Sequence, residues 1–170
     1  SDPSELLTAA LLGADDLRAR HALDLVREGV AMPKIAGQLA KMIPTLSEQR
    51  QIAVMNVLIQ TQAPEAKSVV VDLSSNAEGA VRLEAIRNLG YINHPKYIRS
   101  LFEFYYGEDT EASEAALSAL KSYTDQTYMK ELCITRMVNF DGEVQAKAIT
   151  LAEELDASFT AAALKEIAGQ

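Results

Sequence analysis

Residues 79–106 read GAVRLEAIRNLGYINHPKYIRSLFEFYY, and this stretch decides the fold. Its first half places apolar residues at helical spacing and reaches Gly90, a residue that often ends a helix because it tolerates a left-handed backbone. Its second half opens on Pro95, which suits the first turn of a helix because it lacks an amide hydrogen. The stretch therefore predicts two amphipathic helices joined by a tight turn. So short a pair cannot bury its apolar stripes alone, and it needs copies to pack against.

The copies appear when a small residue followed by an aliphatic one is aligned in each predicted first helix. These pairs recur at steps of 31, 32, 31 and 32 residues, and they are Ala22-Leu23, Ala53-Val54, Ala85-Ile86, Ala116-Leu117 and Ala148-Ile149. The second helices keep nearly the same step, with Leu39, Val70, Leu101, Leu132 and Leu164 in equivalent positions. Alanine at a helix crossing lets two backbones come toward the short end of the usual packing distance of about 8 to 10 Å. The step predicts five helix pairs preceded by a half-unit.

We expect a single all-α domain over residues 1–170. Its predicted parts are a half-repeat at 1–13 and repeats at 14–44, 45–76, 77–107, 108–140 and 141–170. Thr127 and Thr160 are the polar residues expected to start the last two second helices. The valines at 69–71 are β-branched, yet they lie in phase with the other second helices, so we predict a helix there as well.

The third unit resembles HEAT repeats, specifically the short bacterial kind named after phycobilisome lyases. The likeness rests on Val81, Arg82, Ala85, Leu89, Gly90, Ile98 and Leu101, and it extends less closely over residues 15–168. The arginine of that pattern is kept at Arg50 and Arg82, whereas the other units carry Ala19, Ser113 and Gln145 there. The resemblance implies an α-solenoid, a right-handed superhelix in which first helices form the outer face and second helices line an inner groove.

The charge and hydropathy of the chain exclude two classes of partner. The net charge of -8 argues against nucleic acids, because phosphate backbones are held by clustered Lys and Arg. A DNA-handling solenoid would need a basic channel. No apolar run approaches the roughly 20 residues of a membrane span, so we expect no membrane partner. The sequence leaves the cytoplasm and the periplasm open. It begins with a serine, and we expect it to be a segment of a longer polypeptide.

Few residues suggest catalysis or metal binding. His21 and His94 lie in different units, without a HExxH motif or a Cys/His cluster. Cys133 stands next to Leu132 with no basic neighbour, so we interpret it as a core residue. The acidic residues at 108–114 fall where a helix begins, a place that the helix dipole makes favourable for them. We therefore expect no enzyme activity and no cofactor.

Six of the ten aromatic residues crowd into positions 91–106. One interpretation is that they fill the space between adjacent units. The other is a partner-binding patch, because tyrosine and arginine are enriched at binding hot spots. Its expected members are Arg99, Glu103 and Tyr106 on one side of the helix, with Lys130 and Asp72 from flanking units.

The sequence predicts a non-catalytic protein-interaction or scaffolding module that holds a peptide, or another domain of the same polypeptide, in its concave groove. The alternative that the resemblance implies is an accessory protein like the phycobilisome lyases, which would bind a small molecule in the tyrosine-rich groove. A deep pocket would favour the alternative, and a shallow open groove would favour the interaction module.

Overall fold

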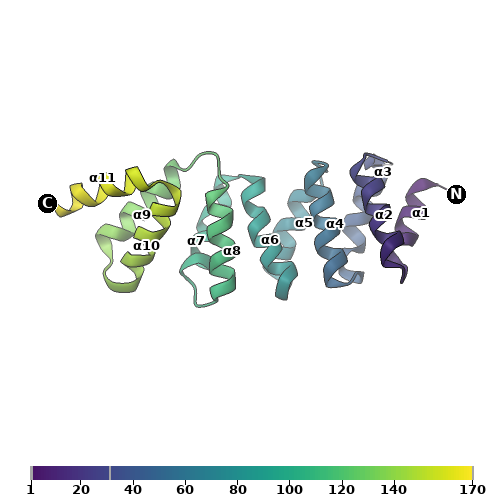
Figure 1. Cartoon of the computed structure of the whole chain (residues 1–170), viewed down its shortest axis with the longest axis horizontal. Helices are drawn as coiled ribbons and strands as arrows, with labels where there is room; N and C mark the ends of the chain where they lie inside the picture. The colour runs from purple at the N-terminus through teal and green to yellow at the C-terminus, as the bar shows by residue number, and fades with distance from the viewer. Residues whose placement is uncertain (1, 31, 170) are drawn as a thin grey trace. The chain divides into compact units, whose positions relative to one another are not determined.

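The chain is all-helical. The computed structural model describes residues 2–30 and 32–169, and these residues form eleven α-helices, two short 3₁₀ segments and no strand (Figure 1). The chain divides into two compact units, unit 1 at residues 1–85 and unit 2 at residues 86–170. The boundary falls within α6. The predicted all-α fold is confirmed.

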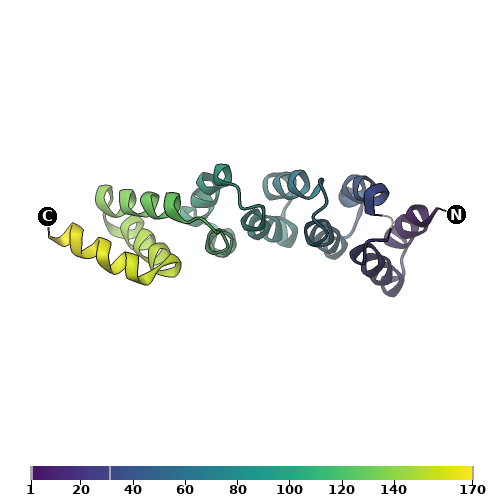
Figure 2. The same ribbon diagram turned by 90° about the horizontal axis from the view of Figure 1, so that it is seen from above.

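Unit 1 holds five complete helices and the beginning of a sixth. The elements are α1 (Pro3–Leu12), α2 (Asp16–Arg27), α3 (Met32–Met42), η1 (Ile43–Thr45), α4 (Glu48–Gln60), α5 (Ala66–Asn76) and α6 (Gly79–Ile92). Neighbouring helices pack in two rows, because α1 contacts α3 while α2 contacts α4. Both rows are visible within this unit in Figure 2, where α3 and α5 lie on one side and α2 and α4 on the other.

Unit 2 holds the end of α6 and five further helices. The five helices are α7 (Ile98–Tyr106), α8 (Thr110–Lys121), α9 (Thr127–Asn139), α10 (Gly142–Leu155) and α11 (Ala157–Ala168), and the 3₁₀ segment η2 (Pro95–Tyr97) precedes α7. Helix α8 packs against α7 and α10, and α10 also packs against α9 and α11. The helices fall at the predicted repeat step, except for the end of α6 and the start of α11, and the valines at 69–71 lie within α5. The superhelical arrangement of the whole chain stays a prediction.

The core is built mainly from the repeated positions. The apolar residue three places after each aliphatic one is at most 2% exposed in all five units: Val26, Val57, Leu89, Leu120 and Ala152. The recurring alanine is buried in four units and partly exposed at Ala53. Burial of this kind contributes roughly 25 cal/mol for each Å² of apolar surface removed from water, so the periodic positions carry much of the stability.

Gly90 does not end its helix, contrary to the prediction. Helix α6 continues to Ile92, and the residue with a left-handed backbone is Asn93, at a φ of 54°. Gly90 is buried against α8, where an added Cβ would lie 2.5 Å from the backbone oxygen of Ala119 and would also collide with Ser122 Oγ. The glycine is needed because two backbones come close together, which helical periodicity alone does not reveal.

The predicted start of the last helix is also wrong. Helix α11 begins at Ala157, and its N-cap residue is Asp156, whose carboxylate accepts a hydrogen bond from the amide of Phe159 at 3.0 Å. Thr160 lies one turn inside the helix, where its buried hydroxyl donates to the Asp156 carbonyl at 2.9 Å. An aspartate is the better cap because it offers a charged acceptor to the free amides of the first turn. Thr127 does stand at the first position of α9.

The polar position that resembles the HEAT arginine contacts a neighbouring helix end. Arg50 donates to the carbonyls of Leu11, at 2.9 Å, and Gly13, at the C-terminus of α1. Ser113 donates to Tyr105 O at 2.7 Å, near the end of α7, and Gln145 donates to Met137 O at 2.9 Å, near the end of α9. Helix ends leave carbonyls without intrahelical partners, so all three side chains satisfy such groups.

Candidate functional site

A groove lies between α7 and α9 of unit 2. Its volume is about 310 Å³, and it is lined by Arg99, Phe102, Glu103, Leu132 and Arg136. We call it the α7/α9 groove. Phe102 is buried and Leu132 is partly exposed, so the groove combines an apolar surface with three charged side chains. Three of the lining residues, Arg99, Phe102 and Arg136, belong to the arginine and aromatic types that are enriched at protein interfaces.

Leu132 lies in the groove because α9 buries the stripe that contains Cys133 and leaves Leu132 partly exposed. The fully or nearly fully buried residues of α9 are Met129, Cys133 and Met137. In α7 the equivalent of Leu132 is Leu101, which is completely buried. The repeat step of 31 residues from Leu101 therefore predicts burial for Leu132, whereas Leu132 is partly exposed. The apolar surface that α9 leaves partly exposed is available for contact with a partner.

The two arginines of the groove are held in place by aromatic side chains. Arg99 Nε donates to the hydroxyl of Tyr128 at 2.9 Å. The guanidinium of Arg136 lies over the ring of Tyr106, with its carbon 4.2 Å from the ring centre. Within the part of the chain that the structure describes, neither arginine forms a salt bridge. Stacking fixes a guanidinium through its face and leaves the N–H groups at its edge available as donors.

Tyr106 contacts the groove residue Arg136 through the face of its ring. Its ring contacts Tyr105 edge to face, at 5.1 Å between centroids. Its hydroxyl is sealed from solvent and has no hydrogen-bond partner among the described residues. Burial raises the pKa of the Tyr106 hydroxyl far above its ordinary value, so the group stays protonated. Tyr106 thus positions Arg136, whereas we expected its side chain to face the partner.

The other predicted patch residues have different surroundings. Glu103 lines the groove and is exposed. Lys130 forms a salt bridge with Asp156 at 2.9 Å, so its charge is already neutralised. Asp72 belongs to α5 in unit 1 and accepts a hydrogen bond from the Asn76 amide at 2.7 Å. Of the five predicted residues, the groove lining includes only Arg99 and Glu103.

Sequence reasoning missed Arg136 as a member of the groove. The signal that could have found it is the repeat step, because position 136 follows Tyr105 by 31 residues, and Tyr105 occupies a buried position of α7. A charged residue at a position that is apolar in the preceding unit cannot enter the core unpaired. Such a residue must turn to the surface, and here it turns toward the groove.

The histidines and the cysteine have structural surroundings. Cys133 is fully buried, as expected, and burial raises the pKa of its thiol to about 12, so the thiol is protonated at neutral pH. His94 Nδ1 accepts a hydrogen bond from the Lys96 amide at 3.2 Å and so caps η2. His21 is exposed on α2. The described residues contain no group of three His, Cys, Asp or Glu side chains that could hold a metal ion.

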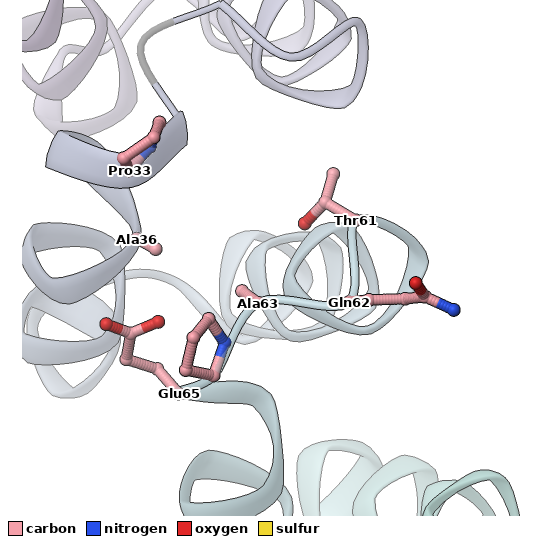
Figure 3. Close-up of a pocket in the computed structure, with 7 residues that line it drawn as sticks. Pro33, Ala36, Thr61, Gln62, Ala63 and Glu65 are labelled. Carbon is pink, nitrogen blue, oxygen red and sulfur yellow. The ribbon is translucent and has the colours of Figure 1, made fainter.

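A second cavity lies in unit 1, between α3 and the turn that joins α4 to α5. Its volume is about 360 Å³, and its lining residues are Pro33, Ala36, Thr61, Gln62, Ala63, Pro64 and Glu65. We call it the Glu65 pocket. Figure 3 shows Pro33 and Ala36 on one side, Thr61 and Ala63 on the other, and the Glu65 carboxylate reaching toward α3.

The turn that forms this pocket has a defined backbone. Gln62 adopts a left-handed conformation, with a φ of 55°, and the amide of Ala63 donates back to Leu58 O at 2.9 Å. This arrangement ends α4 and leads the chain directly into α5, whose N-cap is Glu65. Glu65 carries no distinctive sequence signal, because an acidic residue before a helix is common on a solvated surface.

Comparison with known proteins gives no match from which a function could be transferred. No family model matches the sequence, and no curated protein matches it. The structure defines an all-helical protein with packed neighbouring helices. None of its described helices is long and apolar enough to cross a membrane.

Proposed function

We propose that this chain is a HEAT-like α-solenoid that serves as a non-catalytic protein-interaction module, and that the α7/α9 groove holds an acidic segment of a protein partner. One observation carries the proposal: Arg99 and Arg136 border an apolar groove, and neither has a carboxylate partner among the described residues. A guanidinium offers a planar fork of donors that matches a carboxylate. An acidic segment would supply the missing acceptors.

The apolar part of the groove favours one hydrophobic side chain on the acidic segment of the partner. Leu132 is partly exposed beside the buried ring of Phe102, and an aliphatic or aromatic side chain would cover it. Hot spots of interfaces combine such an apolar anchor with fixed arginines. Glu103 also lines the groove, and it would repel a carboxylate placed next to it. The segment is therefore expected to run with its acidic residues toward the arginines and away from Glu103.

The charge of the groove differs in sign from that of the chain. The chain carries a net charge of -8, whereas the groove lining holds two arginines and one glutamate. Attraction to an acidic segment would act mainly at close range, because salt screens exposed charges over about 10 Å at 0.1 M ionic strength. Binding is expected to weaken as salt rises.

The arrangement of the helices supports the solenoid part of the proposal. In unit 1 second helices contact second helices while first helices contact first helices, as α1 with α3 and α2 with α4 show. Stacked repeats pack in this way. A small-molecule accessory role at the tyrosine cluster is the weaker alternative, because Tyr105 and Tyr106 are packed against each other and their hydroxyls do not form a shared polar site.

Selection from an unbiased peptide library tests the proposal. A random twelve-residue phage library is selected on the wild-type chain, and the enriched phage are then tested against the double variant Arg99→Ala/Arg136→Ala. The expected peptides carry at least one acidic residue and one large apolar residue, and the double variant does not retain them. The matched control is Arg20→Ala, an exposed arginine of unit 1. Enrichment of neutral or basic peptides, or equal retention by the double variant, would contradict the proposal.

A further inference from the structure

We propose that the Glu65 pocket binds a small organic amine in its protonated form. The first support is chemical. The Glu65 carboxylate has no hydrogen bond and no salt bridge among the described residues, and its Oε2 is sealed from solvent. Its other oxygen lies against α3, 3.7 Å from where a Cβ of Gly37 would be. Glu65 is partly exposed, and because its Oε2 is out of reach of solvent, a ligand in the pocket would meet Oε1. A cation placed beside that unpartnered oxygen is attracted by the charge of the carboxylate.

The polar groups of the pocket favour a ligand that carries hydrogen-bond donors. The Thr61 hydroxyl already donates to Val57 O at 2.7 Å, so only its acceptor lone pairs remain for a ligand. The Glu65 carboxylate is also an acceptor. The Gln62 side chain points away from the pocket in Figure 3. A ligand that fits must therefore bring hydrogen-bond donors, and an ammonium group brings three.

The walls of the pocket favour a ligand with a compact apolar body. Pro33, Ala36, Ala63 and Pro64 contribute short, rigid, apolar surfaces. The volume of about 360 Å³ lies near the lower end of the range of about 300 to 1,000 Å³ that is usual for small-molecule sites. A single carboxylate at one side matches a single cationic head. The site lies in unit 1, so it is independent of the α7/α9 groove and of the function proposed for it.

Nuclear magnetic resonance titration tests this site with a defined probe. Phenethylammonium chloride is added to the ¹⁵N-labelled full chain at constant ionic strength, and the amides of Ala36, Ala63 and Glu65 are followed. These amides are expected to shift and to saturate below about 10 mM. The neutral analogue 2-phenylethanol is expected to bind at least tenfold more weakly. The absence of shifts at these amides, or equal binding of the neutral analogue, would overturn the proposal.

Two variants separate the carboxylate from the shape of the pocket. Glu65→Gln keeps the size of the side chain and removes its charge, and it is expected to weaken binding of the probe at least tenfold. Thr61→Val is expected to weaken it by a few fold. The matched control is Glu28→Gln, an exposed carboxylate of the same unit, which should leave binding unchanged. Thermal unfolding followed by circular dichroism shows that each variant is folded. Equal binding by folded Glu65→Gln would also overturn the proposal.

Discussion

Gly37 of unit 1 and Gly90 of unit 2 both lie inside helices, yet only Gly90 lacks room for a side chain. A Cβ at Gly37 would meet only Glu65 Oε1, at an ordinary 3.7 Å, whereas a Cβ at Gly90 would lie 2.5 Å from the backbone oxygen of Ala119. The first glycine faces a flexible side chain, and the second faces the backbone of α8. A glycine within a helix therefore acquires its role from what packs against it.

The two units also differ in the charge of their cavities. The α7/α9 groove presents two arginines that lack carboxylate partners, and the Glu65 pocket presents a carboxylate that lacks a basic partner, in each case among the described residues. Two cavities of one all-helical chain thus carry side chains of opposite charge. What distinguishes them is the identity of a few residues at positions that the core does not use.

The largest effect is expected for Gly90→Ala. The new methyl group must displace the backbone of α8, and overpacking of this kind costs about 2 to 3 kcal/mol. Urea unfolding measures the loss in the free energy of unfolding, and hydrogen exchange locates it in α6 and α8. Alanine has a better helix propensity than glycine by about 1 kcal/mol. A loss of stability smaller than that value would show that the two helices are not in close contact.

A smaller loss is expected for Tyr105→Phe. The Tyr105 hydroxyl donates to the carbonyl of Lys147 at 2.9 Å, which joins α7 to α10. Removal of this hydrogen bond should cost about 1 kcal/mol in unfolding free energy. The position one repeat earlier is Ser74, whose hydroxyl bonds within its own helix to Val71 O at 2.8 Å. Ser74→Ala should cost less than about 0.5 kcal/mol. Equal losses in the two variants would contradict this difference between the units.

Gly37→Ala should stabilise unit 1. The site has room for a methyl group, and alanine is favoured over glycine in a helix interior by up to about 1 kcal/mol. The same urea measurement detects the gain. A loss of stability would mean that the space beside Glu65 is smaller than the structure indicates, and it would remove the contrast with Gly90.

The smallest effect is expected on the loss of stability at acidic pH. The amide of Phe159 and, next, the ammonium of Lys130 hold the pKa of Asp156 below its ordinary value. Because the folded-state pKa is depressed, the stabilisation is present above the unfolded pKa of about 4 and is lost as the pH falls through the lower folded value. Asp156→Asn should therefore reduce the loss of urea stability between neutral pH and pH values below about 4.

The matched comparison in unit 1 is Asp2, a helix cap whose pKa is lowered first by the Ser4 amide. Asp2 lacks a salt bridge among the described residues, so Asp2→Asn should flatten the acid dependence less than Asp156→Asn does. A larger effect at Asp2 would show that the Lys130 salt bridge contributes nothing.

The repeat step predicted much of the fold because it follows burial. Val57 and Leu120 are completely buried at equivalent positions, as the periodicity requires. It failed at Gly90, where a close approach of two helices decides the residue, and at Leu132, where α9 buries a neighbouring stripe. Both depend on how one helix meets the next, and that information lies outside the sequence of either helix.

The candidate site was predicted less well than the fold. Arg99 and Glu103 were placed correctly at the surface of α7, because charged residues leave the core. Arg136 and Glu65 were missed because their importance lies in lacking a partner of opposite charge, and the sequence does not show which charges meet. Lys130 illustrates the converse, since Asp156 neutralises it from 26 positions away.

The most direct test of the interaction proposal is the affinity of one library-selected acidic peptide, labelled with fluorescein, measured by fluorescence anisotropy. The peptide should bind the wild-type chain and the Arg20→Ala control equally. It should bind Arg99→Ala and Arg136→Ala at least tenfold more weakly, a difference of about 1.4 kcal/mol or more for each. Equal dissociation constants for the wild type and both groove variants would contradict the account.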